Sequence, residues 1–233
     1  ERFAADITAQ GGDCLTADID IRRDATGLGV PLSALGVFYR PTPLTQDEVL
    51  NTAKRVIIAE AIDNPSNIGA IVRCATGLGW DGLICDTTSA DPLSRRALRV
   101  SMGAAFNFQF ARSNDIAETL QNLNQRGFTV LALTPNNLAT DLSKVMLDSN
   151  TPRALVFGSE RAGLSAEALA SANYQVRIEM NPAIDSLNVA AAAAIAGHCA
   201  APRSRVARGC LPHARRRRPR VRTRPGWTAP APA

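Results

Sequence analysis

Five polar side chains that could hold a substrate stand where apolar, strand-like segments give way to helices. The strand-like segments are residues 56–62, 154–157 and 175–178. The polar residues that follow them are Asn67, Arg73, Glu160, Ser186 and Asn188. Open α/β sheets bind ligands beyond the carboxyl ends of their strands, which is where such residues would lie. The sequence therefore predicts a ligand site that includes Glu160, Ser186 and Asn188.

Each of the five residues also has a plain structural interpretation. Arg73 keeps its charge and can clamp a phosphate, but it can equally be a surface arginine on an amphipathic helix. Asn67 and Ser186 can orient a substrate, or they can cap the helices that begin near them. Glu160 lies in a glycine turn, where it can pair with Arg73, orient a substrate or stay solvated. Asn188 is the hardest to explain structurally, because asparagine is unfavourable inside an alanine-rich helix.

Three stretches of the chain resemble the signature motifs of the SpoU (TrmH) family of RNA ribose 2'-O-methyltransferases, in the SPOUT superfamily. They are DNPSNIGAIVRCATGLG at residues 63–79, GSERAGLS at residues 158–165 and IEMNPAIDSLNVAAAAAIA at residues 178–196. The motifs come in the family's order, which makes the resemblance specific. It extends over about residues 56–197, which is an ordinary size for one domain.

The resemblance implies methyl transfer from S-adenosylmethionine to a ribose 2'-hydroxyl of ribosomal or transfer RNA. Arg73 matches the first-motif arginine, which is expected to bind the target phosphate and to help activate the hydroxyl. Asn67 matches the asparagine of the same motif, and Glu160 matches the acid of the second. Ser186 and Asn188 match the third motif. These five are the expected catalytic residues.

The family holds its cofactor mainly through backbone groups of the motif loops. The expected cofactor contacts are Gly158, Ile178, Met180 and Leu187. The apolar members of this set can flank the adenine, and core packing is the alternative. The chain departs from the common family pattern at Arg161, Glu179 and Ala183, which replaces no expected catalytic residue. No metal site is expected, because the chain lacks clustered ligands and has only two histidines.

Strand and helix patterns alternate along the chain. Further strands are expected at residues 82–85, 106–110 and 129–133, and helices at 68–78, 91–102 and 115–126. A short helix follows Gly163, and an alanine-rich helix opens at residues 186–188. This alternation predicts an α/β fold, a mostly parallel sheet with helices on both faces. The resemblance adds a SPOUT-type trefoil knot at the carboxyl end, a rare exception to unknotted chains.

Three segments are expected. Residues 1–45 are a partial N-terminal substrate-binding segment or an extension, with possible strands at residues 14–19 and 36–39. Residues 53–200 form the SpoU-type methyltransferase domain. Residues 201–233 form an Arg/Pro-rich tail that is expected to be disordered, and that can still attract RNA.

The net charge of +5 misrepresents the chain. Ten of the 26 basic residues lie in residues 202–233, which contain no acid, so 16 bases face 21 acids in the rest. Nucleic-acid binding therefore cannot be argued from global charge.

The remaining features favour a cytoplasmic protein without a membrane span or a signal peptide. No apolar run is long enough to cross a bilayer. The five cysteines form no CxxC pair and are odd in number, which is typical of reduced thiols in the cytosol. The resemblance further implies a homodimer that pairs through the knot region and the last helix.

Two other functions compete with the methyltransferase. One is a catalytically inactive RNA-binding relative of the same fold, which would bind no cofactor. The other is a nucleotide-dependent oxidoreductase, which needs a GxGxxG turn directly after a strand. The chain's Gly77 and Gly79 lie instead at the expected end of a helix, so this second alternative ranks low.

Overall fold

The computed structural model describes residues 2–9, 11–27, 34–37, 39–148, 150–181 and 183–201. The chain divides after Thr42 into two compact units. From residue 202 on, the predicted Arg/Pro-rich tail lies outside the described residues, and so does the prediction that it is disordered. No helix in the described ranges is long and apolar enough to cross a membrane.

The described residues of the first unit form two short helices, α1 (Arg2–Ala9) and α2 (Ile19–Thr26). Helix α2 ends at Gly27, whose φ of 61° is the left-handed conformation that commonly stops a helix. The strand expected at residues 14–19 is wrong, because residues 14–18 are irregular and Ile19 begins α2. Residues 36, 37 and 39 also lie outside any strand.

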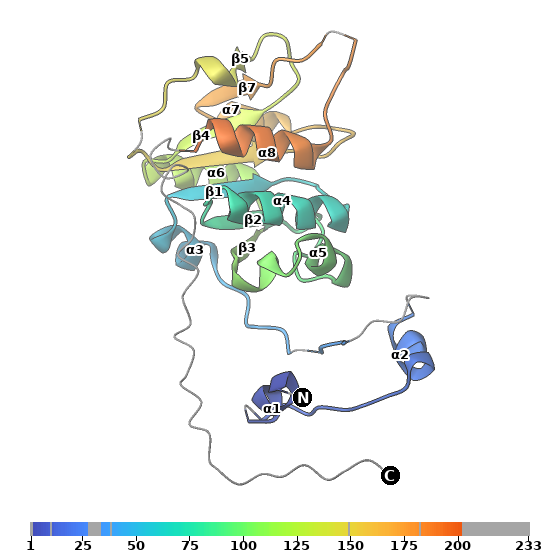
Figure 1. Ribbon diagram of the computed structural model, residues 1–233. Coiled ribbons are helices and arrows are strands. Elements are labelled where there is room, and N and C mark those ends of the chain that lie inside the picture. Colours follow the sequence, from blue (N-terminus) through green and yellow to red (C-terminus); the bar gives the residue numbers. More distant parts are fainter. Residues whose placement is uncertain are drawn as a thin grey trace, which may run out of the picture. The chain divides into compact units, whose positions relative to one another are not determined.

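The second unit is built around a seven-stranded sheet in which the described strands all pair in parallel (Figure 1). The strands are β1 (Arg55–Ala59), β2 (Gly82–Asp86), β3 (Gln109–Ser113), β4 (Thr129–Leu133), β5 (Thr140–Asp141), β6 (Arg153–Phe157) and β7 (Tyr174–Arg177). Their spatial order is β3-β2-β1-β6-β4-β7-β5. The next two strands in the chain, β2 and β3, lie on one side of β1, and on its other side β6 separates β1 from β4, β7 and β5. Sheets of this type bind ligands in the crevice beyond the carboxyl ends of such a central strand pair.

Helices cover both faces of this sheet. They are α3 (Gln46–Thr52), α4 (Pro65–Gly77), α5 (Arg95–Val100), α6 (Ile116–Gln125), α7 (Ala166–Ser171) and α8 (Val189–Cys199), with 3-10 helices η1 (Ala104–Asn107) and η2 (Leu142–Lys144). Helices α4 and α8 lie side by side across one face in Figure 1. Helices α3, α6 and α7 belong to the hydrophobic core of the other face.

The residues of β1 alternate between the two cores. Ile57 and Ala59 pack with α4 and α8, whereas Val56 and Ile58 pack with α3 and α6. All five residues of β1 are buried, which explains why residues 56–59 are a continuous apolar run rather than an alternating pattern. The predicted α/β fold with helices on both faces is therefore confirmed.

Three boundaries differ from the sequence prediction for local reasons. Phe106 belongs to η1, so the strand expected at residues 106–110 begins instead at Gln109. The helix expected from Asp91 begins only at Arg95, because the Ser94 side chain is its cap and accepts a hydrogen bond from the Ala97 N–H at 3.3 Å. The loop expected at residues 136–145 contains the anticipated helical turn, η2, and also the short strand β5.

Helix α8 is anchored at its carboxyl end. The Trp80 indole N–H donates to the Gly197 carbonyl at 3.1 Å, and a Cβ at Gly197 would lie 3.1 Å from Leu78 Cδ1. The buried Arg153 guanidinium donates to the Ala200 carbonyl at 2.8 Å. These contacts hold the last described helix against α4 and the start of β6, and so fix the position of its first residues.

Candidate active site

Three of the five predicted catalytic residues meet in one hydrogen-bonded cluster, the Asn67–Glu160–Asn188 triad. The Asn67 amide donates to Glu160 Oε1 at 2.8 Å, and the Asn188 amide donates to the same oxygen at 2.9 Å. The Asn188 amide also lies 3.1 Å from Asn67 Oδ1 and donates to it. The fold thus brings Glu160 and Asn188, which follow Asn67 by 93 and 121 positions in the sequence, into contact with it.

The start of α4 carries Asn67. Asn64 is the cap of this helix, since its side chain accepts from the Ser66 N–H at 2.8 Å, and Pro65 takes the first helical position. The structural interpretation of Asn67 as the helix cap is therefore wrong. Asn67 is the third residue of the helix, has only 7% of its surface exposed, and donates from its amide to Glu160.

A tight glycine hairpin presents Glu160. The Gly163 N–H donates to the Ser159 carbonyl at 3.0 Å, and Gly163 has a φ of 71°. A Cβ on Gly158 would lie 2.2 Å from the Gly163 carbonyl carbon, so the two strands of the hairpin approach as closely as they do only because residue 158 is glycine. Glu160 stands at the tip of this hairpin, directly beyond β6.

Glu60 ties this hairpin to β1. Its carboxylate accepts from the Ser165 hydroxyl at 2.7 Å and from the Ser165 N–H at 2.9 Å. Ser165 is in turn the cap of α7 and accepts from the Ala168 N–H at 3.1 Å. The loop after β6 is thereby fixed against the loop after β1, and the two loops carry Glu160 and Asn67.

The loop after β1 has a second support at the end of β2. Asp86 accepts from the Ser89 N–H at 2.9 Å, and the Ser89 hydroxyl accepts from the Ile62 N–H at 2.9 Å. Partial burial opposes ionisation of Asp86, but hydrogen bonds from Ser89 and Thr88 outweigh it and hold the pKa of the carboxyl below its ordinary value. This ionised carboxylate stabilises the loop that leads into α4.

Asn188 is the cap of α8. Its Oδ1 accepts from the Ala190 N–H at 2.9 Å, while its amide nitrogen reaches Asn67 and Glu160. The alternative interpretation of Ser186 as the cap of this helix is therefore wrong, and Asn188 does not lie inside the helix. Ser186 is exposed and forms no hydrogen bond with the other described residues. The structure therefore does not bring it into the triad.

Arg73 also stands apart from the triad. It is exposed on α4 and forms no hydrogen bond or ion pair within the described part of the chain. Six residues separate it from Asn67, which on an α-helix is about 9 Å along the axis and about 120° around it. The possible ion pair between Arg73 and Glu160 is absent, since Glu160 bonds to the two asparagines instead. The guanidinium is available to a phosphate that approaches from solvent.

The expected cofactor residues surround the carboxyl ends of β6 and β7. Gly158 follows β6, Ile178 and Met180 follow β7, and Leu187 precedes the α8 cap. All four are half-buried. Among the described residues, no backbone hydrogen bond outside the helices and strands engages Gly158, Met180 or Leu187. Backbone groups left without partners beside half-buried apolar side chains fit an adenosine, which has polar ring edges and apolar faces.

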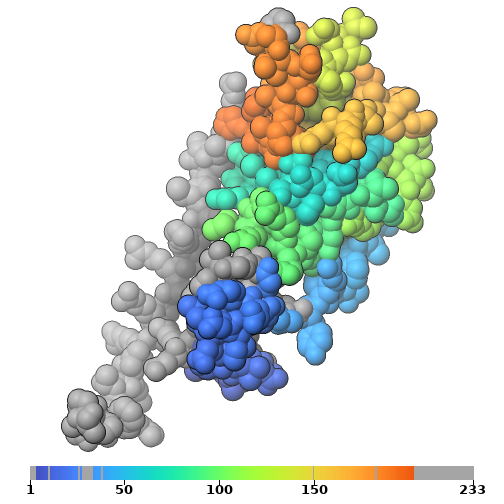
Figure 2. Space-filling view, turned by 90° about the vertical axis from the view of Figure 1, so that its right-hand side faces the viewer, coloured from blue at the N-terminus to red at the C-terminus, as the bar shows by residue number. Residues whose placement is uncertain are grey.

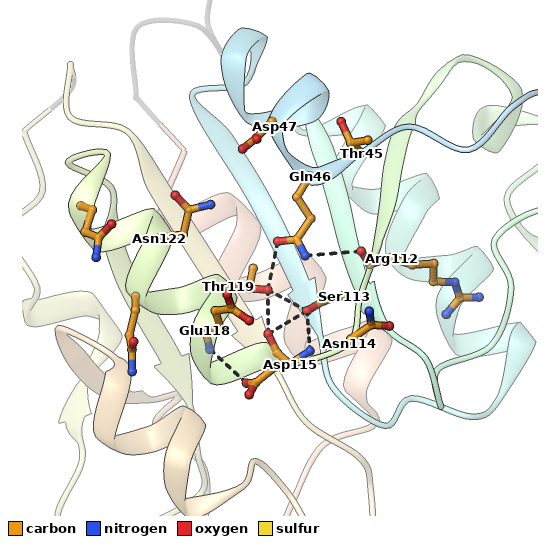
Figure 3. Close-up of a pocket in the computed structure, with 12 residues that line it drawn as sticks. Thr45, Gln46, Asp47, Arg112, Ser113, Asn114, Asp115, Glu118, Thr119 and Asn122 are labelled. Atoms are coloured by element: carbon orange, nitrogen blue, oxygen red, sulfur yellow. Dashed lines mark hydrogen bonds between the residues drawn. The ribbon is translucent and has the colours of Figure 1, made fainter.

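A hollow lies beside the carboxyl end of β3 (Figure 3), and none of the triad residues lines it. It has a volume of about 670 Å³ and lies between α3, β3 and the start of α6. Its polar side chains bond to one another: the Thr119 hydroxyl donates to Gln46 Oε1 at 3.0 Å and lies 2.7 Å from the Ser113 hydroxyl. We therefore assign no chemistry to this hollow. The described residues also contain no cluster of three potential metal ligands.

Sequence comparison identifies relatives of this chain. Residues 54–198 match the model of the SpoU rRNA Methylase family. An uncharacterized tRNA/rRNA methyltransferase of Mycobacterium tuberculosis (strain ATCC 25618 / H37Rv) is 36% identical over 192 residues, which are 82% of this chain and 67% of the relative.

Solved structures show the same architecture. The AdoMet-bound rRNA methyltransferase from Sinorhizobium meliloti superimposes with a TM-score of 0.74 at 27% identity, over 85% of this chain and 75% of that one. The SpoU methyltransferase AviRb from Streptomyces viridochromogenes, in complex with AdoMet, has a TM-score of 0.62 at 26% identity, over 71% and 66% of the two chains.

Proposed function

Because this chain belongs to the SpoU rRNA methylase family, we propose that it transfers a methyl group from S-adenosylmethionine to a ribose 2'-hydroxyl of ribosomal or transfer RNA. The observation that carries this proposal is the Asn67–Glu160–Asn188 triad at the carboxyl ends of the central strands. The triad has the residues of all three motifs in contact, and it lies where sheets of this type bind their ligands.

The reaction places few demands on covalent chemistry by the protein. S-adenosylmethionine supplies the methyl group as a sulfonium; the methyl carbon–sulfur bond breaks, a carbon–oxygen bond to the ribose forms, and the hydroxyl proton is released. The protein must hold the 2'-oxygen in line behind the methyl group, and positioning of this kind accounts for a large share of catalysis.

The roles we propose follow from the geometry. Glu160 Oε1 is occupied by the two asparagine amides, which leaves Oε2 free to accept a hydrogen bond from the ribose hydroxyl. Arg73 binds the phosphate of the target nucleotide, because its guanidinium is exposed, charged and not committed to a described partner. Ser186 is exposed in the loop before α8, and its hydroxyl contacts the bound substrate.

Backbone groups of Gly158, Ile178, Met180 and Leu187 hold the cofactor in this proposal.

The triad argues against the inactive RNA-binding alternative, because a protein that only binds RNA has no need for a carboxylate held by two amides. The domain limits predicted above and the trefoil knot remain part of the proposal.

We further propose a homodimer that works in the cytoplasm. The family resemblance supports pairing through the last helix, and α8 presents Ile195 with 41% of its surface exposed, which is consistent with a partner on this side. Multi-angle light scattering of the purified chain should give twice the monomer mass. A monomer mass at micromolar concentration would remove this part of the proposal.

Calorimetric titration with S-adenosylmethionine and S-adenosylhomocysteine tests the function. We expect both to bind, close to one per chain. Gly158→Ala provides the matched variant and should bind neither, since its Cβ would collide with the backbone of Gly163. A wild-type chain that is folded and binds neither compound contradicts the proposal.

A further inference from the structure

A concentration of arginine lies beside the start of α4. Helix α5 has the sequence RRALRV, so three of its six residues are arginines: Arg95, Arg96 and Arg99. All three are exposed. This density is unusual for a chain whose first 201 residues contain more acids than bases. Arg96 and Arg99 are three residues apart and therefore lie on one face of the helix.

Arg96 is held in place by a residue next to the triad. Its Nε donates to the Ser66 hydroxyl at 2.8 Å, and Ser66 directly precedes Asn67 in α4. The bond uses one nitrogen of the guanidinium and leaves both terminal nitrogens available. No carboxylate in the described ranges forms an ion pair with Arg96. A polar bond thus orients a charge that nothing in the described structure neutralises.

Helix α5, which carries Arg96, packs closely against α4. A Cβ on Gly69 would lie 2.6 Å from the Ala97 carbonyl oxygen and 2.9 Å from Ala97 Cα, so α4 and α5 are in backbone contact there. The two helices form a continuous surface, coloured from cyan to green in Figure 2. Arg73 lies seven residues after Ser66, or two turns along the same side of α4. The basic face therefore runs from the phosphate site proposed for Arg73 to Arg96 and Arg99.

We propose that this Arg96–Arg99 face binds backbone phosphates of the RNA that flank the methylated ribose, with Ser66 as the residue that aims Arg96. The inference rests on the proposed function, because it takes the triad as the position of the ribose. A guanidinium with both terminal nitrogens available makes paired hydrogen bonds to a phosphate, and such contacts position RNA without reading its sequence. The face would add affinity for RNA and none for the cofactor.

Fluorescence anisotropy with a labelled stem-loop RNA of mixed sequence tests this proposal over a range of salt concentrations. Arg96→Ala should weaken RNA binding about tenfold, the loss of a charge-assisted hydrogen bond. It should also reduce the slope of log affinity against log salt by about 1, the effect of one lost phosphate contact. Arg96→Lys should keep the slope and lose less affinity, because it keeps the charge without the Nε bond.

Two further variants separate charge from orientation. Ser66→Ala should weaken RNA binding without a change in slope, because no charge is removed. Lys54→Ala removes one exposed positive charge at the opposite, amino-terminal edge of the sheet and should leave RNA binding unchanged. All four variants should bind S-adenosylmethionine as the wild type does.

The inference and the proposed function fail in different ways. RNA affinity and slope in Arg96→Ala equal to those of Lys54→Ala would overturn the inference, as would a wild type that does not bind the RNA. Loss of cofactor affinity in Arg96→Ala would also overturn it, since the residue would then act through the fold of the site. The proposed function is refuted separately, by a wild-type chain without cofactor binding and methyl transfer.

Discussion

The triad makes a quantitative prediction for Asn67→Ala. The substitution removes a charge-assisted hydrogen bond of 2.8 Å to Glu160 and a neutral one of 3.1 Å from Asn188. Typical net values are about 1.5–3 kcal/mol for the first and about 0.5–1.5 kcal/mol for the second. Glu160 is exposed and regains water when its partner is lost, so the lower end of both ranges applies. We expect a loss of about 2 kcal/mol in the free energy of unfolding.

A double-mutant cycle with Glu160→Ala isolates the contact. Urea unfolding without cofactor should give a coupling free energy between Asn67 and Glu160 of about 1 kcal/mol. Asn64→Ala is the matched control: it removes the cap of the same helix at a cost of about 1 kcal/mol and should be additive with Glu160→Ala. The urea m-values should not change.

Asn67→Ala should also transfer methyl groups about 100-fold more slowly than the wild type, because a Glu160 carboxylate displaced by about 1 Å loses its alignment with the ribose. Affinity for S-adenosylmethionine should fall much less, since Asn67 is not among the expected cofactor contacts. Additivity of Asn67→Ala and Glu160→Ala to within about 0.5 kcal/mol, or turnover equal to that of the wild type, would refute the reasoning.

Three further predictions concern the supports of the site. Gly158→Ala should lower the free energy of unfolding by about 1–3 kcal/mol in thermal or urea melts, because its Cβ meets the Gly163 backbone at 2.2 Å; an unchanged melt would contradict the hairpin geometry. Burial raises the pKa of the Cys85 thiol to about 12, so this cysteine should resist a thiol reagent at pH 8 until the protein unfolds, and modification mapped by mass spectrometry checks this. The folded-state pKa of Asp86 is lowered, so its contribution to stability is present above the ordinary value near 4 and is lost as the pH falls through the folded value. Asp86→Asn should therefore destabilise the protein by about 1 kcal/mol or less at pH 7, and urea unfolding should show a smaller difference from the wild type at pH 3.

Local signals in the sequence were sufficient for much of the fold. The strand predicted at residues 129–133 is β4, and the helix predicted at residues 115–126 is α6, whose cap is Asp115, with its side chain accepting from the Glu118 N–H at 3.0 Å. An apolar run and a cap residue are encoded within a few positions, so they can be recognised without tertiary information. The short strand β5 was missed because two residues carry no periodic pattern.

The arrangement of the site depends on contacts that are distant in sequence. Asn64 and Asn67 are equally good caps by residue type, and only the position of Glu160 shows why Asn67 turns inward. The motifs indicated which residues to consider, but not that Glu160 would bond to two asparagines rather than to Arg73. The supporting role of Glu60 was missed altogether, because its partner Ser165 lies 105 residues away. An acid directly after a buried strand was the one signal that could have indicated it.

The most direct test of the central claim is the chemical identity of the product. The purified chain is incubated with S-adenosylmethionine carrying a labelled methyl group and with ribosomal and transfer RNA that lack modification, and the RNA is digested to nucleosides for mass spectrometry. We predict the label on the ribose of a 2'-O-methylnucleoside, with Arg73→Ala giving none of it while still binding the cofactor. Label on a base, or no label from a chain that binds S-adenosylmethionine, would contradict the account.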